Sequence, residues 1–226
     1  MNHDLETIAR IAQARKTVKI LAESELPTTS DARAIERLLA CAGWAPFHKV
    51  CHADHRQGEL NGIEPWRFHC LDAQQCRKLG HQVSQIEAAG KIPAMLAAAS
   101  HLIIATWLPN PASAASNAES SVVAHEAFEP TIDNVEHIAA ASAAIQTLLL
   151  AATAAGISNY WSSGGVLRTP DLFSKLGIPS NQRLLGAIFL FPAEVPDDCS
   201  VEIATSKLRA QRNPTSAWSR VVKLPT

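Results

Sequence analysis

The uncharged segment Ile138–Ile157 constrains the fold of this 226-residue chain more than any other feature of its sequence. The segment is as long as the roughly 20 residues that span a membrane. However, it is rich in alanine, it carries polar residues such as Ser142 and Gln146, and no cluster of lysine or arginine flanks it. Because small side chains let neighbouring elements approach closely, we expect a central buried helix from about residue 133 to 155, with Gly156 as its stop.

The rest of the chain alternates helical patterns with a few separated strand patterns. Apolar periodicity, capping residues and prolines predict helices, and short apolar runs predict strands. Helices are expected at about 4–14, 31–45, 72–89, from Pro93 onward and at 169–177, and strands at 67–71, 102–107, 159–162 and 184–191. The tail from residue 195 shows only a weak pattern. These elements predict a single α+β domain in which a small sheet is covered by helices on both faces.

Composition and charge exclude several classes of protein. Lysine and arginine number 20 against 21 for aspartate and glutamate, so the chain lacks the basic excess of a general nucleic-acid binder. Its five cysteines are an odd number at irregular spacing and form no CxxC pair, which argues against a disulfide framework. Residues 1–19 mix charges throughout and do not have the pattern of a signal peptide. We therefore expect a cytoplasmic protein that binds neither nucleic acid nor a membrane.

The first motif that could carry chemistry is the run Arg15-Lys16-Thr17-Val18-Lys19, which follows the first expected helix. Its cations would offset the charge of a phosphate, and its hydroxyl would donate a hydrogen bond to that group. A structural interpretation also accounts for the run, because basic residues near the end of a helix complement the helix dipole.

Three further motifs lie at the junctions of expected elements. Ala45-Pro46-Phe47-His48-Lys49 ends the second helix, and Glu64-Pro65-Trp66-Arg67-Phe68 opens the first strand. Ordinary turn chemistry and core packing would explain both. Trp161-Ser162-Ser163-Gly164-Gly165 ends a later strand with hydroxyls and glycines, which suits a ligand that approaches the main chain, although a simple turn has the same pattern.

Taken in order, these motifs resemble the pattern of the FMN-dependent nitroreductase family. That family opens with Arg-Arg-Ser-Val-Arg, continues with an Ala-Pro loop and a Gln-Pro-Trp-x-Phe strand start, and ends near Trp-x-Ser-Gly. Its short, minimal branch carries Ala-Pro-Asp-His-Lys, which residues 45–49 match as Ala-Pro-Phe-His-Lys. The resemblance spans about residues 5–192. It implies an α+β nitroreductase-like fold, with a central mixed or antiparallel sheet flanked by helices, in a domain-intertwined homodimer.

The resemblance also implies a cofactor site. Arg15 and Thr17 would hold the FMN phosphate with Lys16 beside them, and Lys19 would face the ring system or the ribityl chain. Arg212, near the C-terminus, would be a second phosphate cation. The implied activity is electron transfer from NAD(P)H through FMN to a small nitroaromatic or quinone-like acceptor, with ping-pong kinetics.

The resemblance implies that the Ala-Pro loop, residues 45–49, packs against the flavin ring and forms a wall of the site, partly supplied by the partner subunit. It also implies that the turn at residues 161–165 supplies backbone donors to the ring. The N–H groups of Gly164 and Gly165 would point toward the flavin. The other residues assigned to cofactor binding are Pro46, Phe47, His48, Glu64, Trp161, Ser162 and Ser163. No catalytic side chain is needed, because the flavin itself carries the chemistry.

The chain departs from the family pattern in the loop before Pro65. Residues 47–63 form an insert longer than the usual spacing allows, and Glu64 stands where the family has glutamine. A carboxylate that faced the ring would repel negative charge on it. Two other segments lie outside the shared motifs. Residues 109–130 are expected to form a lid that sets acceptor size, and residues 195–226 are a C-terminal extension.

The insert supports a competing hypothesis. His48, Cys51, His52 and His55 together offer enough imidazole and thiolate to bind a transition metal such as Zn²⁺, although their spacing matches no known zinc finger. A plain polar loop explains them as well, and we assign no metal ligand. The remaining histidines share no spacing and are expected at the surface or at helix ends. Two alternatives therefore stay open: a non-catalytic flavin- or metal-binding protein, and a specialised flavin reaction such as reductive dehalogenation.

Overall fold

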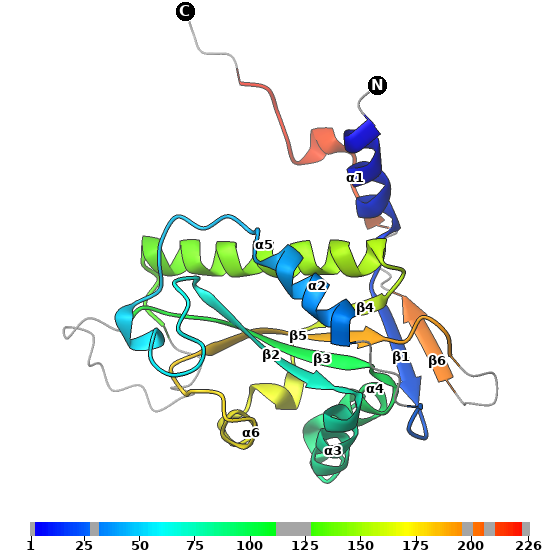
Figure 1. The fold of residues 1–226 in the computed structure, drawn as a ribbon. Coiled ribbons are helices and arrows are strands. Elements are labelled where there is room, and N and C mark those ends of the chain that lie inside the picture. The colour runs from blue at the N-terminus through cyan, green and yellow to red at the C-terminus, as the bar shows by residue number, and fades with distance from the viewer. Residues whose placement is uncertain (1–2, 28–31, 112–127, 196–200, 206–210, 223–226) are drawn as a thin grey trace, which may run out of the picture.

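The computed structural model, which describes residues 3–27, 32–111, 128–195, 201–205 and 211–222, is built around a four-stranded sheet (Figure 1). The sheet order is β2-β3-β5-β4, and every neighbouring pair is antiparallel. Its strands are β2 (Trp66–Asp72), β3 (His101–Trp107), β4 (Ser158–Ser162) and β5 (Arg183–Phe191). All four lie where the apolar runs predicted them, and the sheet is antiparallel rather than mixed.

A second, two-stranded sheet pairs β1 (Val18–Ala22) with β6 (Val201–Thr205), with Ile20 opposite Ile203. The sequence pattern predicted neither strand. β1 begins inside the basic run, and β6 lies in the tail that showed only a weak pattern. Because the two strands are far apart along the chain, their pairing is a tertiary contact that local periodicity does not contain.

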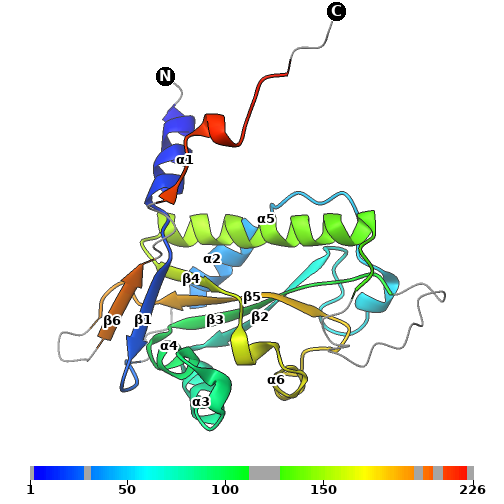
Figure 2. The ribbon, with the colours of Figure 1, turned by 180° about the vertical axis from the view of Figure 1, so that it is seen from behind.

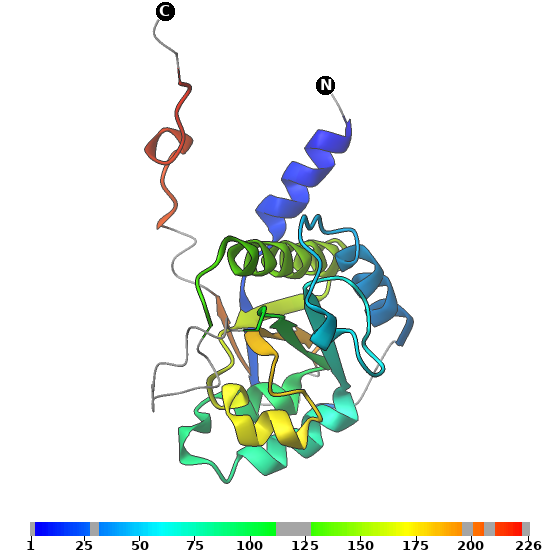
Figure 3. The ribbon, with the colours of Figure 1, turned by 90° about the vertical axis from the view of Figure 1, so that its left-hand side faces the viewer.

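Helices cover both faces of the four-stranded sheet, as the alternation of elements predicted. α2 (Ala32–Ala42) and α5 (Ile132–Ala154) lie on one face, and α3 (Ala73–Val83), α4 (Ile92–Ala98) and α6 (Pro170–Lys175) lie on the other (Figures 1 and 3). The helix predicted at 72–89 is shorter than expected, because α3 ends at Val83 and residues 87–89 form a separate 3₁₀ turn.

Strand β3 is buried on both faces, which explains its uninterrupted apolar run. Ile104 belongs to an apolar cluster that includes Leu96 of α4 and Phe189 of β5. Ile103, one residue earlier, points to the opposite face and belongs to a cluster with Ile145 of α5. Side-chain alternation along the strand thus gives the sheet one apolar layer against each set of helices.

α5 is the central helix that the uncharged segment predicted. It begins after Thr131, whose hydroxyl accepts a hydrogen bond from the Asn134 backbone N–H at 3.2 Å. Its buried face includes Ala144, Leu148 and Ala152. By length and composition α5 could also cross a membrane, but 44% of its apolar stretch is buried inside this chain. Its packing against the sheet is that of a core helix.

Two polar residues of α5 are also buried. His137 is 0% exposed, and its Nδ1 lies 2.7 Å from the Leu108 carbonyl oxygen. The Asn134 side chain donates to the Glu129 carbonyl and accepts from the Asn110 backbone N–H, both at 2.8 Å. The expectation that His137 lies at the surface or at a helix end is therefore wrong, because this residue fixes the exit of β3 to α5.

Both ends of the described chain project beyond α5, away from the four-stranded sheet (Figures 1 and 2). α1 (His3–Ala14) has no buried residue, and its apolar side chains Leu5 and Ile8 are exposed. The C-terminal segment 211–222 is exposed throughout, including Trp218 and Val221. These ends therefore carry apolar surface that the chain itself does not cover.

The three segments that fall outside the shared motifs differ in how much of them is described. The insert 47–63 is described throughout. Of the lid expected at 109–130, residues 112–127 lie outside the described part of the chain, so the lid stays a prediction. The C-terminal extension contains β6 and a 3₁₀ turn at Thr215–Ala217, with gaps between them in the described ranges.

Candidate functional site

The predicted phosphate cluster lies at the junction of α1 and β1. Arg15 directly follows α1, and its Nη1 donates to the Thr17 hydroxyl oxygen at 3.5 Å. Lys16 is exposed, and the Lys19 ammonium lies 4.6 Å from the centre of the Tyr160 ring on β4. The junction therefore gathers guanidinium, hydroxyl and ammonium groups, a donor set suited to a phosphate. Because Arg15 and Lys16 also follow the C-terminus of α1, the interpretation through the helix dipole fits the same geometry.

A second group of predicted residues forms the turn between β4 and the 3₁₀ helix Gly165–Arg168. Gly164 has a φ of 101°, which favours glycine, and its N–H donates to the Ser162 hydroxyl at 3.2 Å. The exposed Ser163 accepts a hydrogen bond from Arg168 at its carbonyl oxygen. Gly165 is exposed and opens the 3₁₀ helix, where an N–H has no acceptor within the helix. Of the two glycine N–H groups expected to face a flavin, that of Gly164 is already bonded within the turn, which leaves that of Gly165 for a ligand.

Trp161 depends on a residue that the motifs did not single out. Its indole lies over Gly186 of β5, where a Cβ would overlap the indole nitrogen. The indole N–H donates to the Leu185 carbonyl oxygen at 3.5 Å. Gly186 therefore allows Trp161 to occupy its place beside the turn. The available signal was a lone glycine inside an apolar strand, which indicates the close approach of another group.

The Ala-Pro loop forms an exposed wall at the beginning of α5. Pro46 is exposed, and Phe47 packs edge-on against Trp66 with ring centres 5.6 Å apart. His48 is exposed, and its Nδ1 lies 3.9 Å from Oε2 of Glu136 on α5. The loop is thus fixed through its aromatic residue and leaves Pro46 and His48 accessible to a ligand.

Arg67 organises the insert, a role that the sequence analysis did not identify. Its side chain is 5% exposed, and its three nitrogens donate to five backbone carbonyls at 2.7–2.9 Å. The accepting residues are His55, Leu60, Gly62, Glu64 and Trp66. Glu64 is half-buried and, with Asn61, lines a cavity of about 310 Å³ at the end of α2. The backbone around Glu64 is therefore positioned by the Arg67 guanidinium.

The insert does not assemble its four potential metal ligands into one site. Each contacts a different partner: His48 meets Glu136, Cys51 the Gly62 carbonyl, His52 Asp54, and His55 the Pro109 carbonyl. Among the residues that the structure describes, no group of three His, Cys, Asp or Glu side chains is arranged to hold a metal ion. The metal-binding alternative thus finds no support in the geometry of the insert.

The two halves of the predicted site contact different parts of α5 and of the strand that follows it. Lys19 contacts Tyr160 on β4, the strand that follows the C-terminus of α5. Lys49 Nζ lies 3.4 Å from Oδ1 of Asp133, in the first turn of α5. His48 contacts Glu136 in the second turn of α5, and Ala45 shares an apolar cluster with Ala140 and Ala144 near the middle of that helix. The phosphate cluster, by contrast, contacts the strand that follows the C-terminal end of α5, so several helical turns separate the two groups. One chain therefore does not bring the phosphate cluster and the ring wall together. The predicted second phosphate cation, Arg212, is exposed in the projecting C-terminal segment.

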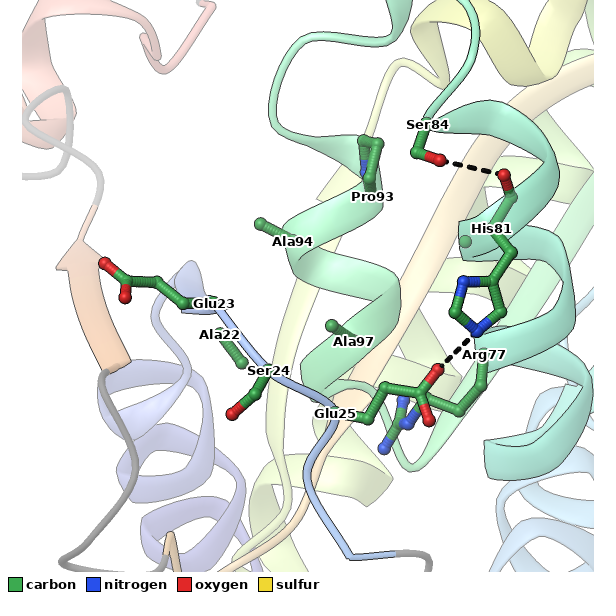
Figure 4. Close-up of a pocket in the computed structure, with 11 residues that line it drawn as sticks. Ala22, Glu23, Ser24, Glu25, Arg77, His81, Ser84, Pro93, Ala94 and Ala97 are labelled. Carbon is green, nitrogen blue, oxygen red and sulfur yellow. Dashed lines mark hydrogen bonds and ion pairs between the residues drawn. The ribbon is translucent and has the colours of Figure 1, made fainter.

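A separate cavity of about 400 Å³ lies on the other side of the sheet, between the end of β1, α3 and α4 (Figure 4). His81 Nε2 and Glu25 Oε1 face each other across it at 2.9 Å. Arg77 is 6% exposed and donates to three backbone carbonyls that tie α3 to α4 and to the turn after β1. None of the predicted site residues lines this cavity. It is therefore not part of the candidate cofactor site.

Comparison with known proteins agrees with the motifs and with the fold. The sequence model of the nitroreductase family matches residues 12–190. A search of curated proteins gave no match. The matched region contains Arg15–Lys19, the Ala-Pro loop and the turn after β4, so it includes both halves of the candidate site.

Solved structures show the same fold across nearly the whole chain. A nitroreductase-like family protein from Bacillus cereus has a TM-score of 0.61 and 19% identity, over 96% of each chain. A nitroreductase family protein from Streptococcus pneumoniae TIGR4 has a TM-score of 0.58 and 15% identity, over 95% of this chain and 99% of that one. A nitroreductase from Desulfovibrio desulfuricans, solved in complex with FMN, has a TM-score of 0.55 and 17% identity, over 96% and 98%. The predicted nitroreductase-like α+β fold is confirmed.

Proposed function

The chain belongs to the nitroreductase family, and on that premise we propose that it is an FMN-dependent oxidoreductase that passes electrons from NAD(P)H to a small organic acceptor. The observation that carries the proposal is the grouping of Arg15, Thr17 and Lys19 at the start of β1. An FMN complex of the structurally similar Desulfovibrio desulfuricans protein supports the choice of cofactor. We propose a nitroaromatic or quinone-like acceptor, since such molecules suit an open flavin site.

The donors at the start of β1 fit the phosphate of FMN. Arg15 and Lys16 would supply positive charge, and the Thr17 hydroxyl would donate to a phosphate oxygen. Lys19, held against the Tyr160 ring, would stand further along the cofactor. Bound FMN would supply the redox chemistry, taking a hydride from NAD(P)H and then passing electrons to the acceptor in ping-pong order.

The ring would lie against the wall formed by Pro46, Phe47 and His48. Because Phe47 is fixed against Trp66, this wall would keep its shape when a planar ring packs on it. The exposed N–H of Gly165 would donate a hydrogen bond to the ring system. These residues bind and orient the cofactor, and none of them needs to act as a nucleophile.

We propose that the complete site forms in a homodimer, because in one chain its two halves are separated by several turns of α5. A two-fold axis across α5 would set the C-terminal end of one α5 beside the N-terminal end of its copy. The surface available for this contact is apolar: Ile132 and Val135 on α5 are 74% and 54% exposed. Leu5 and Ile8 of α1 add further exposed apolar area, which a second copy would cover.

The first test is FMN binding and reduction. Purified protein with added FMN should show a bound flavin band that NADH or NADPH bleaches in the absence of oxygen. Replacing Arg15 and Thr17 together by alanine should weaken FMN binding by about 10–100-fold, because charge-assisted hydrogen bonds to the phosphate are lost. Arg10→Ala removes an exposed cation from α1 and should leave the affinity unchanged.

The same experiment separates the alternatives. A bound flavin band that stays oxidised would favour a non-catalytic flavin-binding protein or a specialised reaction such as reductive dehalogenation. Failure to bind FMN at all would refute the proposed function.

The second test asks whether the site is shared between subunits. Arg15→Ala and His48→Ala chains, each defective alone, would be combined with different purification tags. If the site is shared, each mixed dimer contains one intact site, and random mixing restores about a quarter of wild-type activity. If each site is built within one chain, both sites of the mixed dimer stay defective and no activity returns.

We propose a cytoplasmic location as well. The four described cysteines, Cys41, Cys51, Cys70 and Cys76, are free, as expected in a reducing compartment. Recovery of the protein in the cytosolic fraction without detergent is the measurement that checks this.

A further inference from the structure

The insert builds a cavity that the cofactor motifs do not account for. This cavity, of about 250 Å³, lies where the 3₁₀ turn Ala53–His55, the exit of β3 and the beginning of β5 meet the residues just before α5. Its lining includes Asp54, His55, Asn110, Phe128, Glu129 and Arg183. Five of these side chains can form hydrogen bonds, whereas Phe128, together with Pro109 and Pro111, adds apolar surface, so the cavity suits a polar group carried on an apolar ring.

His55 has one ring nitrogen satisfied and one without a partner. Its side chain is only 8% exposed, and Nε2 lies 2.7 Å from the Pro109 carbonyl oxygen. A carbonyl oxygen can only accept, so Nε2 must carry the proton and Nδ1 of the neutral ring must present a lone pair. Nδ1 is buried and has no hydrogen-bond partner in the described protein. Buried polar atoms are seldom left unsatisfied, so this nitrogen is an acceptor suited to a group that donates a hydrogen bond.

The ionisation of His55 keeps that lone pair available. Burial lowers the pKa of His55 below its ordinary value of 6.5, and the nearby Arg67 cation lowers it further. The hydrogen bond to Pro109 and the Asp54 carboxylate act in the opposite direction but are outweighed. Near neutral pH the imidazole is therefore uncharged and can accept a hydrogen bond.

The other charged groups of the cavity favour the same kind of ligand. Asp54 and Glu129 contribute carboxylates, which accept hydrogen bonds and repel anions. Arg183 is the opposing cation, and its Nη1 already donates to the Ser180 and Gln182 carbonyls at 2.8 and 3.0 Å. A neutral or cationic group with N–H or O–H donors would match this lining better than an anion.

A row of aromatic contacts connects the cavity with the proposed ring wall. Phe47 of the wall packs edge-on against Trp66, which stands opposite Trp107 in the β2–β3 pair. Trp107 packs edge-on against Phe128, with ring centres 4.8 Å apart, and Phe128 lines the cavity. The cavity therefore lies at the same end of α5 as Pro46 and His48.

We propose that this cavity binds a polar substituent of the electron acceptor, with His55 Nδ1 accepting a hydrogen bond from an N–H or O–H of that substituent. The inference rests on the proposed function, because it takes the neighbouring wall as the flavin site. It narrows the acceptor to a small aromatic molecule with a neutral or cationic donor group. His55 is then a specificity-determining residue contributed by the insert.

Matched acceptors test the proposal in the FMN-loaded protein. 4-Nitrobenzamide carries an N–H donor, and its N,N-dimethyl analogue has nearly the same ring but no donor. The wild-type protein should prefer 4-nitrobenzamide in kcat/KM by about tenfold, the effect of one hydrogen bond to a buried acceptor. His55→Phe should abolish the preference, whereas His81→Phe, an exposed histidine on α3, should retain it. Equal kcat/KM values for the two acceptors in the wild-type protein would overturn the proposal.

A binding measurement without turnover keeps this inference separate from the proposed function. Unmodified benzamide would be titrated into ¹⁵N-histidine-labelled wild-type protein, and the Nδ1 resonance of His55 would be followed. A saturable shift with benzamide that N,N-dimethylbenzamide does not produce supports the site, even if NAD(P)H fails to reduce the flavin. No shift with either compound refutes it, even if the protein proves to be an active oxidoreductase. This readout needs no substitution, so a folding defect in His55→Phe cannot decide the outcome.

Discussion

Replacing Arg67 of β2 by methionine should destabilise this protein more than the loss of any single charge within the insert. The guanidinium has five N–H donors, and all of them are directed at backbone carbonyls. The accepting residues run from His55 in the insert to Trp66 at the start of β2. Methionine would fill a similar volume but would leave these carbonyls without a donor.

The expected loss can be worked out from these contacts. One hydrogen bond to a charged donor contributes about 1.5–3 kcal/mol, but five of them do not add, because exposed carbonyls such as that of Leu60 regain water. Each carbonyl that stays buried without a donor costs about 1–3 kcal/mol, so we expect a loss of about 3–5 kcal/mol for Arg67→Met if two of them stay unsatisfied. Arg67→Lys keeps the charge but offers three donors, so we expect about half that loss.

Urea unfolding followed by tryptophan fluorescence would measure these free energies of unfolding. Arg56→Met is a matched control, because Arg56 lies in the insert that Arg67 contacts, is exposed, and donates to a single carbonyl, that of Cys51, at 2.9 and 3.1 Å. Its loss should stay below about 1 kcal/mol. The reasoning is refuted if Arg67→Met unfolds at the same urea concentration as Arg56→Met, or if lysine at position 67 is more damaging than methionine.

Three further predictions concern stability and reactivity. Gly186→Ala should lower stability by about 1–3 kcal/mol, because the added Cβ would overlap the Trp161 indole, and thermal unfolding would show it. Burial lowers the pKa of both His55 and His69, so below about pH 6.5 the unfolded state binds more protons than the folded state. The free energy of unfolding should therefore fall as the pH drops below that value. Replacing both residues by glutamine should make the free energy of unfolding, measured with urea, depend less on pH. Burial raises the pKa of the Cys76 thiol to about 12, so iodoacetamide at pH 8 should label Cys76 only after denaturation, as mass spectrometry of the intact and unfolded protein would reveal.

The candidate site could be predicted in its residue types but not in its assembly. The run Arg15–Lys19 and the Ala-Pro loop were recognisable as candidates, because the groups that would bind a phosphate or a planar ring lie close together in the sequence. Gly186 could not be recognised in the same way, since its importance arises only when the Trp161 indole of the neighbouring strand lies over it. Arg67 was visible as part of a motif, but its five carbonyl partners appear only in the folded insert.

The sequence by itself determined the local elements and the family. Hydrophobic periodicity is a property of neighbouring residues, so the α5 segment and the four strands of the main sheet could be located from it. Tertiary structure alone decided which distant segments meet. The β1–β6 pairing and the burial of His137 against Leu108 depend on contacts between residues far apart in the chain. The same reason explains the divided candidate site. The order of motifs is compatible with a site within one chain, but in the folded chain several turns of α5 separate Arg15–Lys19 from Pro46–His48.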